Sequence, residues 1–467
     1  MTQPLVLLNV VGLTYDMIGE RTPHLKKLAD QGFARPLGTV LPAVTCSAQS
    51  TLLTGTLPNE HGIVGNGWYD RDLAEVLFWK QSNRLVSGER VYQTARKKDP
   101  RYTTAKLFWW YNMYAPVEWS VTPRPSYPAD GRKVFDSYSF PPELKDRLQN
   151  ELGVFPLLRF WGPGADITSS RWIADAAIRT LQWYRPSLTM VYLPHLDYNL
   201  QRLGPNDPAI DQDLQSVDAE AGRIIDAAED TGALVVVVSE YAITPVSRPV
   251  HINRVLRNQG LLSVRREPTG WETLDMGASR AFAVSDHQVA HVYIRDQNDI
   301  ALVSRILKQT PGIEDVLSES DKTHQGLHHE RSGELIAISE PDSWFTYYFW
   351  VDDALAPDYA RTVDIHRKPG YDPVELLYNP SLRFPMLRMA QRLARKKLGF
   401  RYYMDIIGLD GSQVKGSHGR LPRSGHESCE GPVFIASSKR LLDQTPDLPK
   451  TIPMTSVKEL ILKMQFG

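Results

Sequence analysis

Cysteine is scarce in this sequence, since its 467 residues include only Cys46 and Cys429. Two cysteines supply neither a disulfide framework nor a zinc site built from thiolates. Lys and Arg together number 53 and Asp and Glu number 54, so neither sign of charge is in excess. This balance provides no bulk attraction to nucleic acid or to a membrane surface, and we expect neither as a partner.

Long apolar runs are also missing from the sequence. No stretch of about 18 apolar residues occurs, so a membrane-spanning helix is not expected. Residues 1–12 contain an apolar run without a cationic region before it, which favours a first β-strand over a signal peptide. Together these features predict a soluble, cytoplasmic protein.

Short apolar runs alternate with helical patterns along much of the chain. Residues 5–11, 188–194 and 233–239 have the continuous apolar character of strands that are buried on both faces of a sheet. Helices are predicted over residues 22–32, 170–184, 210–229, 251–259 and 386–398. This alternation predicts an α/β fold, with a mostly parallel central sheet flanked by helices on both faces. We expect one such domain over residues 1–467.

The composition changes between residues 68 and 165, where aromatic residues and prolines crowd together. We expect residues 68–165 to form an inserted cap over the site, although any single aromatic residue there is more often part of an ordinary core. The basic residues of the helix expected at 386–398 are interpreted as a solvated face rather than as a membrane or RNA contact.

A hydroxyl residue stands just before a short predicted helix in the stretch 42–66. Residues 47–54 are expected to be helical, and Gly55 is placed to end the helix. Thr45 would then lie at a helix N-terminus, where free N–H groups and the helix dipole favour a phosphate or a developing oxyanion. A lone Thr at this place is also a common N-cap, so the helix alone does not assign chemistry to it.

The same stretch closely resembles the nucleophile region of the alkaline phosphatase superfamily, in particular its nucleotide pyrophosphatase/phosphodiesterase (type I phosphodiesterase) family. The matching positions are Pro42, Thr45, Leu53-Thr54-Gly55, Pro58, His61-Gly62-Ile63 and Asn66. The resemblance implies an alkaline phosphatase-like fold, with Thr45 as a transiently phosphorylated nucleophile and Asn66 as a donor to phosphoryl oxygens. It implies hydrolysis of a small phosphorylated substrate, either a phosphodiester or a phosphomonoester.

Enzymes of this family hold two divalent metal ions with three carboxylates and three histidines from separated loops. The resemblance places Asp197, Glu240 and His418 at retained ligand positions, with Glu240 one methylene longer than the family's Asp. Three residues therefore still match the family as metal ligands.

The other ligand positions depart from the family. Val11 stands where the family has Asp, and Gln201 and Tyr241 stand where it has His. Asn9 precedes Val11 by two residues on the same face of the strand, so Asn9 and Gln201 are candidate neutral ligands and Tyr241 offers a phenol. The remaining donors are rich in oxygen, so we expect one metal site or two weak ones, holding Mg, Mn, Ca or Zn.

A polar loop in the last third of the chain supplies further candidates. His366 is a candidate metal ligand, and Arg367 and Lys368 are candidates to orient the substrate. His195 and the cluster formed by Asp286-His287 and His291 are more simply explained as hydrogen-bonded or surface groups.

Three functions remain open at this point. The leading hypothesis is a metal-dependent hydrolase that works through phosphorylated Thr45. The alternative is a catalytically degenerate alkaline phosphatase-like fold that serves as a binding or scaffold protein, and it is favoured by the substituted ligand positions. A mutase or phosphotransferase on the same core differs only in the acceptor. The sequence leaves the oligomeric state and the substrate undefined.

Overall fold

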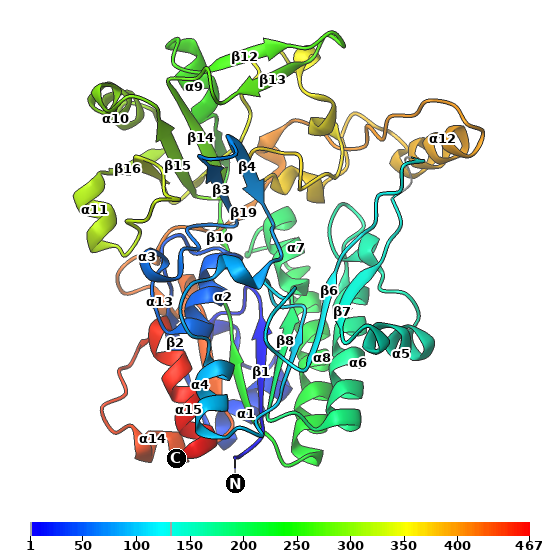
Figure 1. The fold of residues 1–467 in the computed structure, drawn as a ribbon, viewed down its shortest axis with the longest axis vertical. Coiled ribbons are helices and arrows are strands. Elements are labelled where there is room, and N and C mark those ends of the chain that lie inside the picture. The colour runs from blue at the N-terminus through cyan, green and yellow to red at the C-terminus, as the bar shows by residue number, and fades with distance from the viewer. Residues whose placement is uncertain (1, 131–132) are drawn as a thin grey trace.

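A nine-stranded sheet forms the centre of the computed structural model, which describes residues 2–130 and 133–467 (Figure 1). Its order is β21-β2-β20-β9-β1-β8-β5-β6-β7. The strands are β1 (Leu5–Val10), β2 (Phe33–Gly38), β5 (Thr104–Leu107), β6 (Trp119–Pro123), β7 (Ser137–Phe140), β8 (Leu188–Leu193), β9 (Leu234–Val238), β20 (Val433–Ala436) and β21 (Ile452–Pro453).

Strand β1 lies in the middle of this sheet. It runs parallel to β8 and to β9, and Leu8 pairs with Val191 on one side and with Val237 on the other. Every residue of β1 and β8 is buried, as expected for strands covered on both faces. Between β20 and β7 in this order, only these two end strands are antiparallel to their neighbours. The prediction of a mostly parallel α/β sheet is therefore confirmed.

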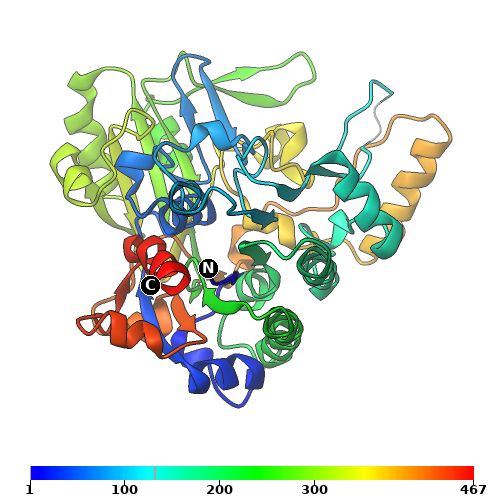
Figure 2. The same cartoon turned by 60° about the horizontal axis from the view of Figure 1, so that its bottom comes forward.

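Helices cover both faces of the sheet (Figure 2). One group comprises α1 (Pro23–Gln31), α6 (Ile167–Tyr184), α7 (His195–Leu203) and α8 (Ile210–Asp230). The other group comprises α2 (Thr45–Thr54), α4 (Val91–Lys98) and α15 (Val457–Phe466). α1 and α8 approach so closely at Gly222 that a Cβ atom there would lie 2.4 Å from the His24 ring. A side chain at this position would push the two helices apart.

A second hydrophobic core lies beyond one end of the main sheet, in the upper half of Figure 1. It is built on a four-stranded sheet of order β14-β15-β17-β16. The strands are β14 (Ala281–Asp286), β15 (Val289–Ile294), β16 (Ile313–Leu317) and β17 (Leu335–Ser339), with α9 (Ile252–Asn258), α10 (Ile300–Lys308), α11 (Glu319–His324) and the hairpin β12 (Ser263–Arg266) and β13 (Glu272–Asp275) around them. Residues 261–295 thus form two antiparallel hairpins, β12–β13 and β14–β15.

Residues 68–165, expected to form an inserted cap, are divided between the two sheets. The hairpin of β3 (Gly67–Asp70) and β4 (Glu75–Phe78) joins the second core through Phe78. Strands β5, β6 and β7 extend the main sheet, and α5 (Pro142–Leu152) packs on β7. Part of this region therefore continues the central sheet instead of lying over it.

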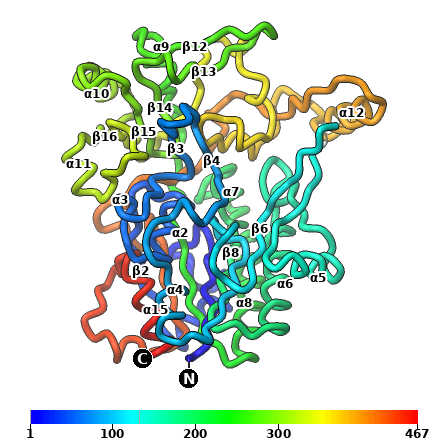
Figure 3. Tube along the Cα trace, in the orientation of Figure 1, coloured from blue at the N-terminus to red at the C-terminus, as the bar shows by residue number. Residues whose placement is uncertain are grey.

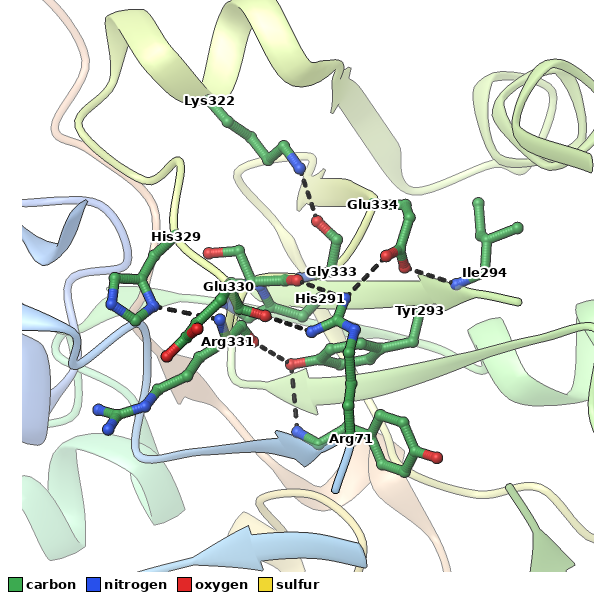
Figure 4. Close-up of polar contacts among 12 residues, drawn as sticks. Arg71, His291, Tyr293, Ile294, Lys322, His329, Glu330, Arg331, Gly333 and Glu334 are labelled. Carbon is green, nitrogen blue, oxygen red and sulfur yellow. Dashed lines mark hydrogen bonds and ion pairs between the residues drawn. The ribbon is translucent and has the colours of Figure 1, made fainter. Parts of the chain in front are cut away.

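A polar network fastens the β3–β4 hairpin to the second sheet (Figure 4). Arg71 donates to a Glu334 carboxylate oxygen at 2.7 Å, and the Tyr293 hydroxyl donates to the Arg331 carbonyl at 2.7 Å. The Arg331 guanidinium donates to the Gly62 carbonyl at 2.7 Å, at the start of the loop that follows α3 (Pro58–His61). Because this loop leads to Asn66, the network fixes the second core against the site.

His291 belongs to the same network. The Gly333 N–H donates to its Nδ1 at 3.1 Å, so the ring proton lies on Nε2, which donates to the Val64 carbonyl at 2.9 Å. Burial lowers the pKa of His291 to about 4, which keeps the ring neutral. His291 therefore has a structural role, in agreement with the expectation from the sequence that it is a hydrogen-bonded histidine.

The remaining strands and α-helices are short, apart from α12. They are α3 (Pro58–His61), β10 (Thr244–Pro245), β11 (Arg248–Val250), β18 (Ser343–Phe345), α12 (Pro385–Lys397), β19 (Gly416–Ser417), α13 (Glu427–Glu430) and α14 (Arg440–Gln444). Among the helices of the described ranges, none combines the length and the apolar character that a bilayer crossing requires.

Candidate active site

Thr45 is the first residue of α2, one position further into the helix than an N-cap, because Val44 occupies the cap with an extended backbone. All ten residues of α2 are buried, and Thr45 itself is only 4% exposed. The next N–H, of Cys46, donates to the Asn66 side-chain oxygen at 3.0 Å. Gly55 ends the helix in the left-handed conformation at φ 72°, as its position in the sequence predicts.

The Thr45 hydroxyl begins a chain of hydrogen bonds. Its Oγ1 lies 3.3 Å from the Tyr241 hydroxyl, which in turn donates to Asp197 Oδ1 at 3.1 Å. Because Tyr241 has one proton and gives it to Asp197, Thr45 must be the donor in its contact with Tyr241. The chain is therefore oriented to carry a proton from Thr45 to Asp197.

Asp197 lies in the first turn of α7, at the end of β8. Gln201, one helical turn later, donates to its Oδ2 at 2.8 Å, and the Tyr371 hydroxyl donates to Gln201 Oε1 at 3.2 Å. Burial raises the pKa of Asp197 to about 7, against the hydrogen bonds from Tyr241 and Gln201 that lower it. The carboxyl group can thus gain and release a proton near neutral pH.

Glu240 follows β9 and is held by two amide groups. Asn9 Nδ2 donates to its Oε1 at 2.5 Å, and Gln49 Nε2 donates to the same oxygen at 2.6 Å. Burial is the largest influence on the Glu240 pKa and raises it to about 8. Glu240 is therefore protonated at neutral pH, with Asn9 beside it on β1.

This buried carboxyl group makes stability depend on pH. The folded pKa of about 8 lies above the ordinary value of 4.5, so the folded chain holds a proton that the unfolded chain releases. The contribution is fully present below about pH 4.5 and is lost as the pH rises to about 8. We therefore expect the free energy of unfolding of wild type, relative to that of Glu240→Gln, to fall across this range in chelator-treated protein, measured by urea unfolding at a series of pH values. The comparison cancels the opposite contribution of buried histidines such as His291, whose pKa is lowered.

The variant Glu240→Gln lacks this titrating group, so its pH dependence should differ from that of wild type by this decline. The exposed carboxyl of Glu20 supplies the matched control, and Glu20→Gln should keep the wild-type slope. An equal slope in wild type and Glu240→Gln would contradict a raised Glu240 pKa.

Four aromatic rings are stacked beside these carboxyl groups. The rings of Tyr241 and His418 lie 3.5 Å apart at an angle of 5°, those of His418 and His287 lie 3.6 Å apart, and those of His287 and Tyr371 also lie 3.6 Å apart. His418 Nδ1 contacts the Ala43 carbonyl at 2.7 Å. The stack therefore brings His418, a retained ligand position, into contact with Tyr241, a substituted one.

The turn between β14 and β15 brings Asp286 and His287 into the site. Asp286 accepts from the Asn66 backbone N–H at 2.8 Å and from the Asn66 side chain at 3.1 Å. Its Oδ1 also lies 2.8 Å from His287 Nδ1, and His287 adopts a positive φ of 61°. Asn66 is thus fixed between Asp286 and the first turn of α2, through Cys46.

The donors around Thr45 do not fit the family's two-metal centre. Val11 is fully buried and apolar, and both oxygens of Asp197 accept hydrogen bonds from Tyr241 and Gln201. The Tyr241 ring lies flat against His418 where the family has an imidazole. Within residues 2–130 and 133–467, no three His, Cys, Asp or Glu side chains gather so that they could hold a metal ion.

The polar loop of the last third reaches this cluster through Tyr371, but its three candidate residues have other partners or face solvent. His366 has an exposed side chain, and Arg367 is half exposed and pairs with Asp358 at 2.9 Å. Lys368 is buried instead, with its ammonium 2.8 Å from Asp372 and 2.7 Å from Glu375. The structure therefore does not bring these three candidates together with Asp197, Glu240 and His418.

The environment of Lys368 predicts a large effect on stability. Lys368→Met leaves two buried carboxylates without their cation, so we expect a loss of about 3–5 kcal/mol in the free energy of unfolding. Arg367→Met breaks only the partly exposed ion pairs with Asp358 and Asp364 and should change the free energy of unfolding by less than about 0.5 kcal/mol. Urea unfolding of both variants measures the difference, and equal stabilities would contradict the buried ion cluster.

Several residues of the site were not selected from the sequence. Gln49 carries a signal, because it follows Thr45 by one helical turn and shares its face. Tyr371 and the pair Asp286-His287 come from distant segments, and no local spacing indicates that they reach the site. His195 is not part of the site, since its Nε2 lies 3.0 Å from Asp213 on α8.

A family model described as type I phosphodiesterase / nucleotide pyrophosphatase matches residues 5–372. The chain belongs to this family. The central sheet, the position of Thr45 at the start of α2 and the placement of Asp197 and Glu240 after β8 and β9 agree with the architecture that the sequence resemblance implies.

Known relatives are distant. An uncharacterized pyrophosphatase/phosphodiesterase of Schizosaccharomyces pombe is 23% identical over 244 residues, covering 48% of this chain and 41% of the relative. The chain thus spans less than half the length of that curated relative.

Solved structures share the fold over nearly the whole chain. Phosphonoacetate hydrolase from Sinorhizobium meliloti, in complex with phosphonoacetate, has a TM-score of 0.61 at 15% identity, covering 99% of this chain and 95% of its own. Murine ectonucleotide pyrophosphatase/phosphodiesterase 5, an inactive Thr-to-Ala variant in complex with AMP, has a TM-score of 0.56 at 13% identity, covering 99% and 94%. At such identities the likeness establishes the fold.

Proposed function

We propose that the protein cleaves a phosphoric ester, either a phosphodiester or a phosphomonoester, by attack of the Thr45 hydroxyl on phosphorus. Family membership supports the reaction class. The observation that carries the proposal is the hydrogen-bonded chain from Thr45 through Tyr241 to Asp197. A weakly acidic alcohol needs a base to become a nucleophile, and this chain connects it to one.

The proposed first step forms the bond between Thr45 Oγ1 and phosphorus and breaks the bond from phosphorus to the leaving oxygen. The Thr45 proton passes through the Tyr241 hydroxyl to Asp197, whose pKa of about 7 suits a general base. Glu240, protonated at neutral pH, interacts with Thr45 and supplies a proton to the leaving oxygen. In the second step water attacks phosphorus and gives a proton to the Glu240 carboxylate, while the bond from phosphorus to Thr45 Oγ1 breaks. Asp197 returns its proton through Tyr241 to Thr45, and phosphate or a phosphomonoester leaves.

The substrate in this proposal is a small phosphorylated molecule. The positive end of the α2 dipole lies at Thr45 and favours the charge of a phosphoryl group. Asn66 is held rigidly beside it, as expected for a group that positions phosphoryl oxygens. Phosphonoacetate and AMP, the ligands of the two similar structures, are the size of molecule to test first.

The divalent metal ion of the leading hypothesis takes no part in the proposed steps. Two metal ions would polarise the phosphoryl group and stabilise the leaving oxygen, but the donors described above are committed to one another. The steps proposed here use only side chains of the chain. A cytoplasmic location, expected from the balanced composition, is part of the same proposal.

Hydrolysis of bis(4-nitrophenyl) phosphate and of 4-nitrophenyl phosphate tests the proposal directly. Wild-type protein should release nitrophenolate, and Tyr241→Phe should lose most of this activity because the hydroxyl that links Thr45 to Asp197 is gone. The control Tyr198→Phe removes another buried hydroxyl, on α7 outside this chain of hydrogen bonds, and should remain active. Full activity in Tyr241→Phe would overturn the proton pathway.

A non-catalytic binding or scaffold role is the second candidate. It is favoured by the closed surroundings of Thr45, since Thr45, Asn66 and His418 are each at most 4% exposed and the stacked rings fill the adjoining space. This candidate predicts that AMP binds without turnover. Calorimetric titration with AMP, run beside the hydrolysis assay, separates the two functions.

A further inference from the structure

Helix α12 (Pro385–Lys397) lies on an arm that extends away from the two cores, at the right of Figures 1 and 3. None of its residues is buried. An amphipathic helix of a globular protein normally turns its apolar stripe toward a core, which stabilises it there. The orientation of α12 therefore needs an explanation.

The side of α12 that faces the protein carries Arg388, Arg392 and the partly buried Met389, which packs against a small hydrophobic cluster. Arg388 and Arg392 donate to the carboxylate of Asp405 at 2.7 Å and 3.0 Å, and these contacts fix the rotation of the helix. The opposite side carries exposed apolar residues, at spacings that place them on one face of a helix. They are Met386 (61% exposed), Leu387 (68%), Leu393 (45%) and Leu398 (73%), followed by Phe400 (59%).

Positive charge surrounds this apolar face. Residues 383–402 contain seven Lys and Arg and no Asp or Glu. Arg388 and Arg392 use Asp405, whereas five cations have no carboxylate within 4 Å among the residues that the structure describes: Arg383, Arg395, Lys396, Lys397 and Arg401. The arm thus presents apolar side chains and unpaired cations together.

The neighbouring hairpin of β6 and β7 adds to the same side of the molecule, since both views show it beside α12 (Figures 1 and 2). Tyr127 is 59% exposed and Val134 is 42% exposed. The Lys133 ammonium lies 5.7 Å from the centre of the Tyr127 ring. This second projection repeats the combination of apolar and cationic groups.

We propose that the α12 arm docks the protein on a negatively charged lipid bilayer. A helix with an apolar face and flanking cations lies in the bilayer interface, with its apolar side among the acyl chains and its cations at anionic headgroups. Thirteen residues span about 20 Å, too short to cross a bilayer but enough to lie flat on one. The interpretation of these residues as a solvated face, and the expectation of no membrane partner, are revised by this proposal.

The charge pattern selects the bilayer as the occupant. The arm offers no carboxylate of its own between residues 383 and 402, so its complement is a surface rich in anions around an apolar interior. A second copy of the chain would bring like charges together at this face and be repelled. The cytoplasmic leaflet carries such anionic lipids, which agrees with a cytoplasmic protein that binds it reversibly.

Flotation with lipid vesicles tests the proposal on the full-length protein. We expect wild-type protein to float with vesicles of phosphatidylcholine mixed with phosphatidylglycerol and to remain behind with vesicles of phosphatidylcholine alone. Added salt should weaken the binding, because it screens the cations. Equal binding to both vesicles, or to neither, would overturn the proposal.

Two pairs of substitutions locate the contact. Leu387→Glu with Leu393→Glu should lower the partition coefficient by about tenfold or more, because two apolar side chains no longer enter the interface. Arg395→Gln with Lys397→Gln should lower it about fivefold for each cation removed, which corresponds to ~1 kcal/mol each. All four side chains are exposed, so these variants are expected to fold.

Matched controls lie on other surfaces. Leu73→Glu with Leu158→Glu changes leucines that are 62% and 63% exposed, and Lys27→Gln with Lys450→Gln removes two exposed cations. Both controls should bind vesicles like wild type, and an equal loss in them would overturn the assignment to α12. Sedimentation without lipid tests for self-association. If wild type were a dimer that the pair Leu387→Glu and Leu393→Glu dissociates, a second copy would cover this face and the proposal would be overturned.

Discussion

Thr45→Ala is expected to abolish hydrolysis, with a fall in kcat of at least about a thousandfold, as loss of a covalent nucleophile produces in other enzymes. The alanine keeps the first turn of α2 but has no oxygen to attack phosphorus. Thr45→Ser retains the hydroxyl next to Tyr241 and should keep measurable activity. Initial rates of nitrophenolate release from bis(4-nitrophenyl) phosphate measure all three proteins.

The covalent intermediate gives this prediction a second readout. Acid quenching during turnover of a substrate labelled at phosphorus should leave label on wild-type protein and none on Thr45→Ala, and peptide mapping should locate it at residue 45. Unchanged turnover in Thr45→Ala would remove Thr45 from the reaction. Circular dichroism of the variant verifies that its fold is intact.

The main sheet was predictable because its strands are recognisable locally. Continuous apolar runs mark β1, β8 and β9, and the structure differs from the expected ranges by one residue at the ends. Burial on both faces removes the alternation of polar and apolar residues, and that absence is itself the signal. The helix α7 that follows β8 was not predicted, although Leu196 and Leu200 lie one helical turn apart and both pack into the core.

The position of Thr45 was also predictable, since a helix start and its Gly end are local features. The partners of the site were harder to predict. Asp286 reaches Asn66 across 220 positions of the sequence, and a β-hairpin turn whose place depends on the second core delivers it. Lys368 was instead selected wrongly. A charged residue among other polar residues suggests a substrate-binding loop, but the structure buries Lys368 against Asp372 and Glu375.

The substituted ligand positions have a common physical consequence. At positions 201 and 241, a group that would bind a cation is replaced by one that completes a hydrogen-bond network, since Gln201 donates to Asp197 and Tyr241 links Asp197 to Thr45. Asn9 likewise donates to Glu240. These donors satisfy buried carboxyl groups that a metal ion would otherwise neutralise.

Restoring the family's ligands should therefore create a metal site in this protein. The triple variant Val11→Asp, Gln201→His and Tyr241→His brings the set to three carboxylates and three histidines, together with Asp197, Glu240 and His418. We expect purified wild type, after dialysis against a chelator and then zinc, to retain less than one zinc ion per chain, and the triple variant to retain at least one. Elemental analysis of the dialysed proteins measures this difference.

Thermal unfolding supplies the control for this experiment. Val11 is fully buried, so a carboxylate there destabilises the variant without metal, and zinc should raise its Tm because binding stabilises only the folded chain. Val11→Asn with Gln201→Leu and Tyr241→Phe alters the same three positions without adding an ionisable ligand, and zinc should leave its Tm unchanged. If wild type itself retained stoichiometric zinc, the hydrogen-bond network around Asp197 would have to open to admit the ion, and the expected metal-dependent hydrolase would replace the pathway through Tyr241.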